Sequence, residues 1–247
     1  MAPAIHVSTE LEDPAPLFSE EWLASEVWPA AEALAALVTT KYAPRVRRAQ
    51  QVVELGAGTG ACGLAAASAG ARAVALTDKA LALPVLQRNA AANRSLGAIR
   101  VFVLEWSCAA ERRGLYPELP SGADLLLAAD CLNPIYGEEH ARALAATIAA
   151  LLHRSLRLSD ATDPIALVAQ TSRGGGESGK EAGKRMGGEA EGLFLQSAAE
   201  FGLVVQRVEL LGGVEDAADA GAQEVGHAQI QVFEARPRAG WAGSKCL

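Results

Sequence analysis

The feature that most constrains the fold is an alternation of short apolar, β-branched segments with longer segments whose apolar residues have helical spacing. Strands are expected at 52–55, 73–77, 99–104, 124–129 and 165–169. Helices are expected at 61–69, 81–93, 137–153 and 193–201. Strand–helix alternation with short links predicts an α/β fold, in which one doubly wound, mostly parallel sheet is covered by helices on both faces.

The last two strands depart from this alternation. Residues 203–210 and 228–233 have strand composition, but the glycine-containing stretch at 212–226 leaves no room for a crossover helix. We therefore expect a C-terminal antiparallel hairpin that completes a seven-stranded sheet. In the second of these strands apolar residues alternate with glutamines, which is typical of a strand at or near a sheet edge.

The rest of the chain divides around a single domain at 21–236. Residues 1–20 are rich in proline and acidic residues and are expected to form a flexible leader, and 237–247 a tail. Residues 173–192 are rich in glycine and charge and predict a mobile loop, either a substrate-contacting flap or a tolerated insertion.

Composition excludes several classes of function. The chain has 247 residues, half of them hydrophobic, and a net charge of −7, which argues against a broad basic surface for nucleic acid. No apolar run approaches the roughly 20 residues that cross a bilayer. Four scattered cysteines, four scattered histidines and no secretory signal predict free thiols, no metal site and a default location in the cytosol, with the nucleus as a second location.

A glycine-rich turn between the first strand and its helix carries the strongest chemical signal, Glu54-Leu55-Gly56-Ala57-Gly58-Thr59-Gly60. Glycines let the backbone approach a ligand closely, and the helix that follows offers free N–H groups. The spacing also satisfies the dinucleotide-binding pattern, so a nicotinamide oxidoreductase remains an alternative.

Two carboxylates favour a cationic nucleoside ligand over a dinucleotide. Glu54 lies two residues before the first glycine, where it can meet a ligand's ammonium group but would repel a pyrophosphate. Asp78 ends the second strand, where a carboxylate can accept hydrogen bonds from both ribose hydroxyls. The chain also lacks the Tyr-x-x-x-Lys pair of many nicotinamide enzymes, which further disfavours that alternative.

The motif E-L-G-x-G-x-G followed by a strand ending in Thr-Asp resembles the class I S-adenosylmethionine-dependent methyltransferases. Further segments resemble one branch, the methyltransferase family 16 group of protein-lysine methyltransferases: Val27-Trp28-Pro29-Ala30-Ala31, Leu104-Glu105-Trp106 and Leu127-Ala128-Ala129-Asp130-Cys131. The resemblance covers about residues 25–236 and implies a Rossmann-like methyltransferase fold with S-adenosylmethionine as cofactor.

The resemblance also implies roles for single residues. Trp28 would line the cofactor pocket, and Gly56, Ala57 and Gly58 would pass along the methionine part of the cofactor. Asp78 would hold the ribose, and Trp106 would sit against the adenine. Gly60 and Ala129 would also contact the cofactor. A flat indole offers adenine a large apolar face, and small residues let a ligand lie against the sheet.

Asp130 is the leading residue on the acceptor side, because a carboxylate there could orient a lysine amine that must lose a proton before it attacks. In the family, this residue begins a D-x-x-Y motif, but here Asn133 stands where tyrosine is expected and Tyr136 follows three residues later. Asn133 could accept a hydrogen bond, Tyr136 could replace the tyrosine, or the acceptor could differ.

Protein-lysine methylation is therefore the expected activity. The resemblance suggests that the methylated protein is a chaperone or an ATPase. The enzyme is expected to act as a monomer. The alternatives are methylation of a small molecule or another nucleophile, and a catalytically silent module that binds cofactor or partner. Neither nucleic acid nor a membrane is expected as a partner.

Overall fold

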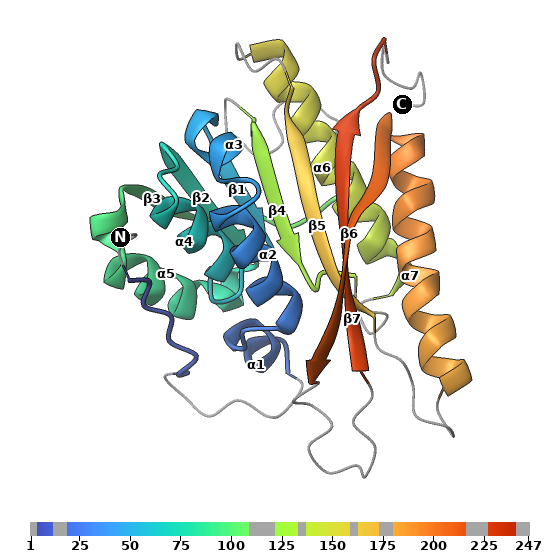
Figure 1. Ribbon diagram of the computed structural model, residues 1–247, viewed down its shortest axis with the longest axis horizontal. Coiled ribbons are helices and arrows are strands. Elements are labelled where there is room, and N and C mark those ends of the chain that lie inside the picture. The colour runs from blue at the N-terminus through green and yellow to red at the C-terminus, as the bar shows by residue number, and fades with distance from the viewer. Residues whose placement is uncertain are drawn as a thin grey trace.

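The structure is a computed structural model that describes residues 4–11, 19–108, 122–132, 137–158, 163–172, 180–215 and 227–240. A single central sheet is flanked by helices on both faces (Figure 1). In the described part of the chain, no helix has the length and apolar character needed to cross a membrane.

Seven strands form the sheet in the order β3-β2-β1-β4-β5-β7-β6. They are β1 (Val52–Leu55), β2 (Ala73–Asp78), β3 (Ala98–Val103), β4 (Leu125–Ala129), β5 (Ile165–Ser172), β6 (Leu203–Glu215) and β7 (His227–Pro237). The first five are parallel, β7 is antiparallel to β5, and β6 is antiparallel to β7. The predicted α/β fold, the C-terminal hairpin and the position of β7 next to an edge strand are confirmed.

The helices divide between the two faces. They are α1 (Glu20–Ser25), α2 (Pro29–Thr39), α3 (Ala43–Arg48), α4 (Ala61–Ser68), α5 (Leu83–Ala92), α6 (Glu138–Leu158) and α7 (Lys180–Glu200), with 3₁₀ turns η1 (Ala80–Ala82) and η2 (Arg94–Leu96). Buried residues of α2, α3, α4 and α5 share one core cluster, and those of α6 and α7 share the other.

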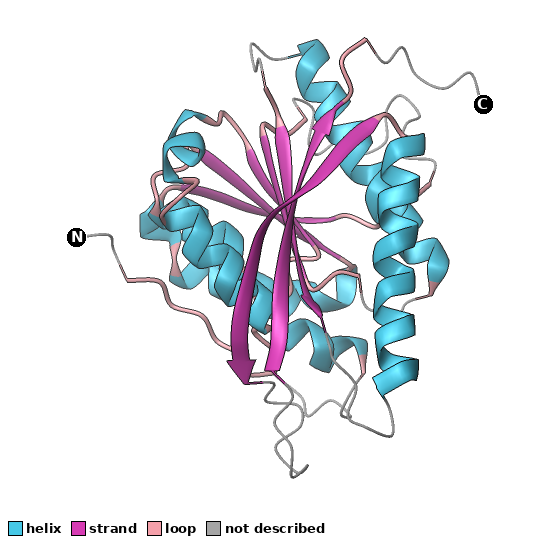
Figure 2. Cartoon of the chain, turned by 45° about the vertical axis from the view of Figure 1, so that its right-hand side comes forward, coloured by secondary structure: helices cyan, strands magenta, loops and turns pink. Residues whose placement is uncertain are grey.

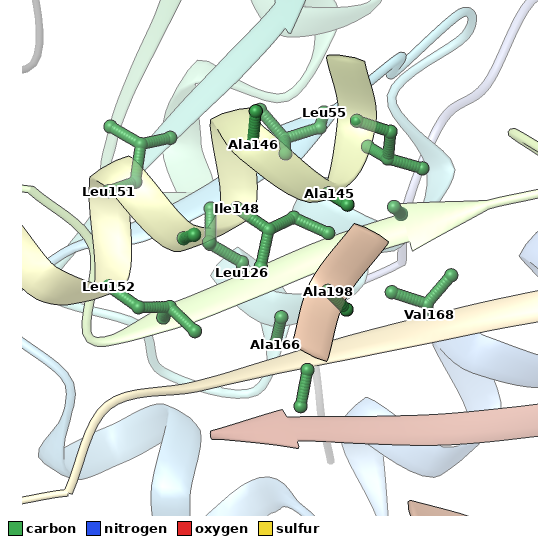
Figure 3. Packing of buried hydrophobic residues seen from close by; sticks show 14 of the residues in the cluster. Leu55, Leu126, Ala145, Ala146, Ile148, Leu151, Leu152, Ala166, Val168 and Ala198 are labelled. Atoms are coloured by element: carbon green, nitrogen blue, oxygen red, sulfur yellow. The ribbon is translucent and has the colours of Figure 1, made fainter. Parts of the chain in front are cut away.

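The alternation of side chains along the strands separates the two cores. Leu125 and Leu127 of β4 belong to the cluster under α2 and α4, whereas Leu126 belongs to the cluster under α6 and α7. Figure 3 shows Leu126 close to Ile148 of α6, above Ala166 of β5. Burial of a leucine or isoleucine of this kind stabilises the fold by roughly 1.5–3 kcal/mol, so the central strands are the most firmly held part of the sheet.

The predicted loop at 173–192 is wrong for residues 180–192, which form the first half of α7. That stretch contains four glycines, each costing about 1 kcal/mol in a helix. Lysine, glutamate, alanine, arginine and methionine between them favour a helix, and the second half of α7 is anchored by buried Phe194 and Ala198. Residues 173–179 lie outside the described residues.

The prediction of a flexible leader at 1–20 is also wrong in part. Residues 4–11 form an extended segment that is hydrogen-bonded to α5, and α1 begins at Glu20. No local pattern marks this contact, because the partner side chains are about 80 residues away. Residues 12–18 and the tail at 241–247 lie outside the described residues.

Strand β6 extends beyond its predicted end at residue 210 to Glu215, and its pairing with β7 has two register shifts, between Arg207 and Glu209 and between Leu211 and Val214. Each shift marks a β-bulge or similar irregularity, which adds residues on one strand without ending the ladder. Figure 2 shows the resulting long, twisted hairpin of β6 and β7.

Candidate functional site

A cavity of about 210 Å³ opens at the carboxyl ends of β1, β2 and β4. The strand order reverses between β1 and β4, since β2 and β3 lie on one side of this pair and β5 on the other. Ligands of open α/β sheets bind at such a switch point. The cavity is lined by predicted site residues from separate parts of the sequence: Trp28, Glu54, Gly56, Ala57, Gly58, Asp78, Trp106, Ala129 and Asp130.

The glycines of the loop between β1 and α4 are required by close contacts. Gly58 has φ +50°, and a Cβ there would lie 2.8 Å from the backbone oxygen of Ala24 in α1. Gly56 has φ +61°, and a Cβ would lie 2.9 Å from Cys131 Sγ and 3.0 Å from the ring of Trp106. Larger residues would therefore fill the space in which a ligand could pass along the backbone.

The two remaining predicted loop residues fix the turn itself. The Ala57 amide donates a hydrogen bond to the Thr77 carbonyl of β2 at 3.0 Å, and the Gly60 amide donates to the Ala57 carbonyl at 2.6 Å. Gly60 is the N-cap residue of α4. Ala57 lines the cavity, whereas Gly60 is not among the lining residues and serves to start the helix.

Glu54 lies beneath the loop and also lines the cavity. Its side chain is only 3% exposed and accepts hydrogen bonds from the amides of Cys62 at 3.2 Å and Gly63 at 2.7 Å, in the first turn of α4. Burial raises the pKa of the Glu54 carboxyl to about 7, although the two amide bonds act to lower it. The Glu54 carboxylate thus binds the free amides of a helix N-terminus, and its contact with a ligand's ammonium group stays a prediction.

Asp78 lies on the other side of the loop, at the end of β2. Its Oδ2 accepts a hydrogen bond from the Gly58 amide at 2.7 Å, and its Oδ1 accepts one from the Lys79 amide at 2.7 Å. The carboxylate also lines the cavity. A carboxylate held by two amides can still accept further bonds on its remaining lone pairs, so the predicted ribose contact is geometrically open.

Both predicted tryptophans line the cavity. Trp28 immediately precedes α2, and its Nε1 donates a hydrogen bond to the Leu23 carbonyl of α1 at 3.0 Å. This bond connects the end of α1 to the start of α2. Trp106 follows β3, and its ring lies 4.5 Å from the His140 ring with an angle of 46° between the planes. Sequence reasoning missed His140, because a single histidine in the first turn of an amphipathic helix carries no pattern of its own.

Asp130 lies at the tip of β4 and, among the described residues, is the only non-glycine residue with a positive φ, at 51°. Thr171 of β5 donates to this carboxylate twice at 2.8 Å, from its amide to Oδ1 and from its hydroxyl to Oδ2. The Ala30 amide, in the first turn of α2, is 3.4 Å from Oδ2. These contacts fix the orientation of the Asp130 carboxylate, and both Asp130 and the neighbouring Ala129 line the cavity.

Thr171 is a further residue that sequence reasoning missed. Its neighbour Ser172 ends β5 and is exposed. The alternation along β5 could have placed Thr171 on a different face from Ser172, yet nothing in the sequence links Thr171 to Asp130.

The other candidates are placed as follows. Asn133 and Tyr136 lie outside the described residues. Cys131 is buried, and burial raises the pKa of its thiol well above the usual range, so it is held as a neutral thiol. Within the described ranges, no group of three or more histidine, cysteine or acidic residues could hold a metal ion.

The seven-stranded sheet, with a glycine loop and a strand-end carboxylate at its switch point, defines a Rossmann-like methyltransferase fold. The chain belongs to the lysine methyltransferase family, whose model matches residues 18–163. That match contains every predicted site residue, from Trp28 to Asn133.

One curated relative is the protein N-lysine methyltransferase METTL21A of Danio rerio, which is 36% identical over 137 residues. The aligned region is 53% of this chain and 58% of that protein, so it spans a little over half the length of the relative.

Two solved structures show the same fold at low identity. The YcgJ protein of Bacillus subtilis has a TM-score of 0.55 at 12% identity, with 85% of this chain and 100% of that chain covered. The magnesium protoporphyrin IX methyltransferase of Synechocystis PCC 6803, with bound SAH, has a TM-score of 0.50 at 14% identity, with coverages of 91% and 89%.

Proposed function

We propose that this protein transfers a methyl group from S-adenosylmethionine to a lysine side chain of a protein. The observation that carries the proposal is the position of the Asp130 carboxylate, which lines the same cavity as the glycine loop and Asp78. A cofactor-binding half and an acceptor-orienting carboxylate thus meet in one pocket. Membership of the lysine methyltransferase family and the relative from Danio rerio support the same acceptor.

The residues present fit S-adenosylmethionine. Gly56 and Gly58 line the cavity without side chains, so the methionine part of the cofactor could pass close to the backbone of the loop. Asp78 would hold the ribose hydroxyls, and Trp106 would offer its ring to the adenine. When bound, the cofactor supplies a methyl group on a positively charged sulfur, which an amine can attack directly.

The chain's own part in the reaction is to bind, orient and exclude water. Asp130 can accept a hydrogen bond from an incoming lysine ammonium and draw it towards the cavity, and its carboxylate favours proximity of the positive charge. Thr171 holds both carboxylate oxygens through its amide and hydroxyl, which fixes the direction in which Asp130 accepts. Before it attacks, the ammonium passes one proton to the Asp130 carboxylate or to water, in a pocket lined mostly by partly or fully buried residues.

Several finer proposals rest on sequence alone. The family resemblance suggests a chaperone or an ATPase as the methylated protein, and the net charge of −7 favours a protein partner over nucleic acid. We also propose that the protein acts as a monomer in the cytosol, with the nucleus as a second location.

The test is incubation with methyl-labelled S-adenosylmethionine and a size-fractionated cell lysate, for the wild type and for Asp130→Asn, which keeps the side-chain shape. We expect a labelled protein band whose label is on lysine after hydrolysis. We expect Asp130→Asn to lower labelling at least 100-fold while the affinity for S-adenosylhomocysteine stays within about threefold.

Other outcomes separate the alternatives. Label in the small-molecule fraction alone would overturn the lysine acceptor, and would fit the asparagine at position 133. Full labelling by Asp130→Asn would overturn the role of Asp130. A wild-type protein that binds neither S-adenosylmethionine nor S-adenosylhomocysteine would contradict the whole proposal.

A further inference from the structure

The N-terminal segment at 4–11, here called the strap, runs beside α5 (Figure 1). Asn89 of that helix and Asn93, its C-cap residue, each bind both backbone groups of one strap residue. Asn93 accepts a hydrogen bond from the His6 amide at 2.9 Å and donates to the His6 carbonyl at 2.6 Å. Asn89 accepts from the Ser8 amide at 2.9 Å and donates to the Ser8 carbonyl at 3.0 Å.

The spacing of these bonds fits both the rise of a helix and the rise of an extended chain. Residues four apart on a helix are about 6 Å apart along its axis, and residues two apart on an extended chain are separated by about 6.6 Å. The side-chain amides of Asn89 and Asn93 are therefore spaced like alternate residues of the strap. The two asparagines bind only backbone groups of the strap, so they recognise its extended conformation more than its side chains.

Both asparagines are buried, each with 1% of its surface exposed. A buried side-chain amide is costly to leave without partners. With the strap in place, the Asn89 carbonyl oxygen and both hydrogens of its amide group have partners. Removal of the strap would leave part of this hydrogen-bonding capacity unpaired.

Asn89 makes a third bond that leads to the cavity. Its Nδ2 also donates to the Thr59 carbonyl at 2.9 Å. Thr59 belongs to the glycine loop and lines the cavity. One amide group therefore joins the strap, α5 and the loop, whereas no such bond links Asn93 to the loop: its Nδ2 donates to the His6 and Asn89 carbonyls.

We propose that the strap is part of the cofactor site, and that Asn89 is a positioning residue that couples the docked strap to the glycine loop. This inference rests on the proposed cofactor. Release of the strap frees Asn89 to turn away from Thr59, which loosens the loop and weakens cofactor binding. By reciprocity, bound cofactor makes the strap harder to release.

The test uses proline in the full-length chain, because proline lacks the amide hydrogen that Asn89 accepts. We compare Ser8→Pro with Val7→Pro, which introduces the same ring at a neighbouring position whose amide makes no hydrogen bond to α5 among the described residues. His6→Pro removes the corresponding bond to Asn93, which has no link to Thr59. Calorimetric titration with S-adenosylhomocysteine measures affinity without need of an acceptor.

We expect Ser8→Pro to raise the dissociation constant about tenfold, His6→Pro about threefold, and Val7→Pro less than twofold. At saturating S-adenosylmethionine, kcat of Ser8→Pro should stay within twofold of the wild type, so the defect appears in KM for the cofactor. Hydrogen exchange at the wild-type amides of residues 6 and 8 should slow when S-adenosylhomocysteine is added.

Equal affinity of Ser8→Pro and Val7→Pro would overturn the coupling while leaving the proposed function intact. A loss of kcat with unchanged cofactor affinity would also overturn it. A wild-type protein without affinity for S-adenosylhomocysteine would overturn both the coupling and the proposed function.

Discussion

The cofactor half and the acceptor side of the cavity are built in different ways. In the cofactor half, Glu54 binds the amide of Gly63, nine residues away, and the loop between them is shaped by its own glycines. On the acceptor side, Asp130 is held by Thr171, 41 residues away, and by Ala30, 100 residues away. The first half is local in sequence, and the second exists only after the sheet and α2 have assembled.

This difference indicates where each half is vulnerable. The glycine loop depends on the absence of side chains, because a Cβ added at Gly56 or Gly58 would collide with neighbouring protein atoms. The acceptor side depends on donors that fix one carboxylate, so it should respond to the loss of a hydroxyl and tolerate a change of size. Substitutions can therefore test the two halves separately.

The largest effect is expected from Gly58→Ala. The new Cβ would lie 2.8 Å from the Ala24 oxygen, and alanine would adopt φ +50° at a cost of roughly 1–2 kcal/mol. The loop and α1 must move apart, so we expect the affinity for S-adenosylhomocysteine to fall at least 100-fold, as measured by calorimetry.

Gly240→Ala is the matched control for that substitution. Gly240 also has a positive φ, +73°, but nothing lies within 4 Å of an added Cβ. It should lower the melting temperature slightly and leave the affinity unchanged. Similar affinities for the two variants would show that the contact with α1 does not shape the pocket.

The second-largest effect is expected on the pH dependence of stability, and it comes from Glu54 beneath the loop. The folded-state pKa of Glu54, about 7, is above the usual value of 4.5, so between these values the folded protein keeps a proton that the unfolded chain has lost. The stabilisation is complete below pH 4.5 and is lost as pH rises through 7. From pH 5 to 7.5 this amounts to about 2 kcal/mol in the free energy of unfolding.

Glu54→Gln removes this titration, so the stability difference between wild type and variant isolates it. Urea unfolding at several pH values should show the wild type losing about 2 kcal/mol relative to the variant. Burial lowers the pKa of His153 and gives the opposite trend, but both proteins share it and it cancels. Parallel stability curves would show that Glu54 does not titrate in this range.

The smallest effect is expected on the acceptor side, from Thr171→Val. Valine has nearly the same shape but cannot donate to Asp130 Oδ2, whereas the bond from the residue 171 amide to Oδ1 and the longer contact of the Ala30 amide with Oδ2 are kept. Loss of one charge-assisted hydrogen bond is worth roughly 1.5 kcal/mol, or about tenfold in rate. We expect kcat to fall about tenfold while the affinity for S-adenosylhomocysteine is unchanged.

Thr171→Ser restores the hydroxyl and should recover most of the wild-type rate. Equal rates for the valine and serine variants would mean that the hydroxyl has no part in orienting Asp130. A fall in cofactor affinity with Thr171→Val would instead show that the two halves of the cavity are not independent.

The same contrast explains what the sequence could predict. The strand–helix alternation and the glycine loop are periodic or local patterns, so the mostly parallel sheet, the hairpin and the placement of Asp78 could be anticipated. The position of Glu54 at the cavity was also anticipated, but not its bonds to the first turn of α4, because spacing alone does not show whether a carboxylate binds a helix end.

The contacts between distant segments could not be predicted. Thr171, His140 and the strap each reach the site through a partner at least 30 residues away, and no local pattern marks such a pair. The helix at 180–192 was missed for a different reason, because glycine content outweighed the helix-forming residues between the glycines in the sequence interpretation.

Strand β6 has a consequence for solubility. As the outermost strand of its side, it offers backbone groups that another chain could extend into a shared sheet, the usual route to aggregation. Its exposed Val204 and Leu210 would favour such pairing. The two register shifts interrupt the regular row of donors and acceptors, and charged Arg207 and Glu209 lie beside the first of them. An incoming strand would have to reproduce both interruptions, so this edge is a poor template for self-association.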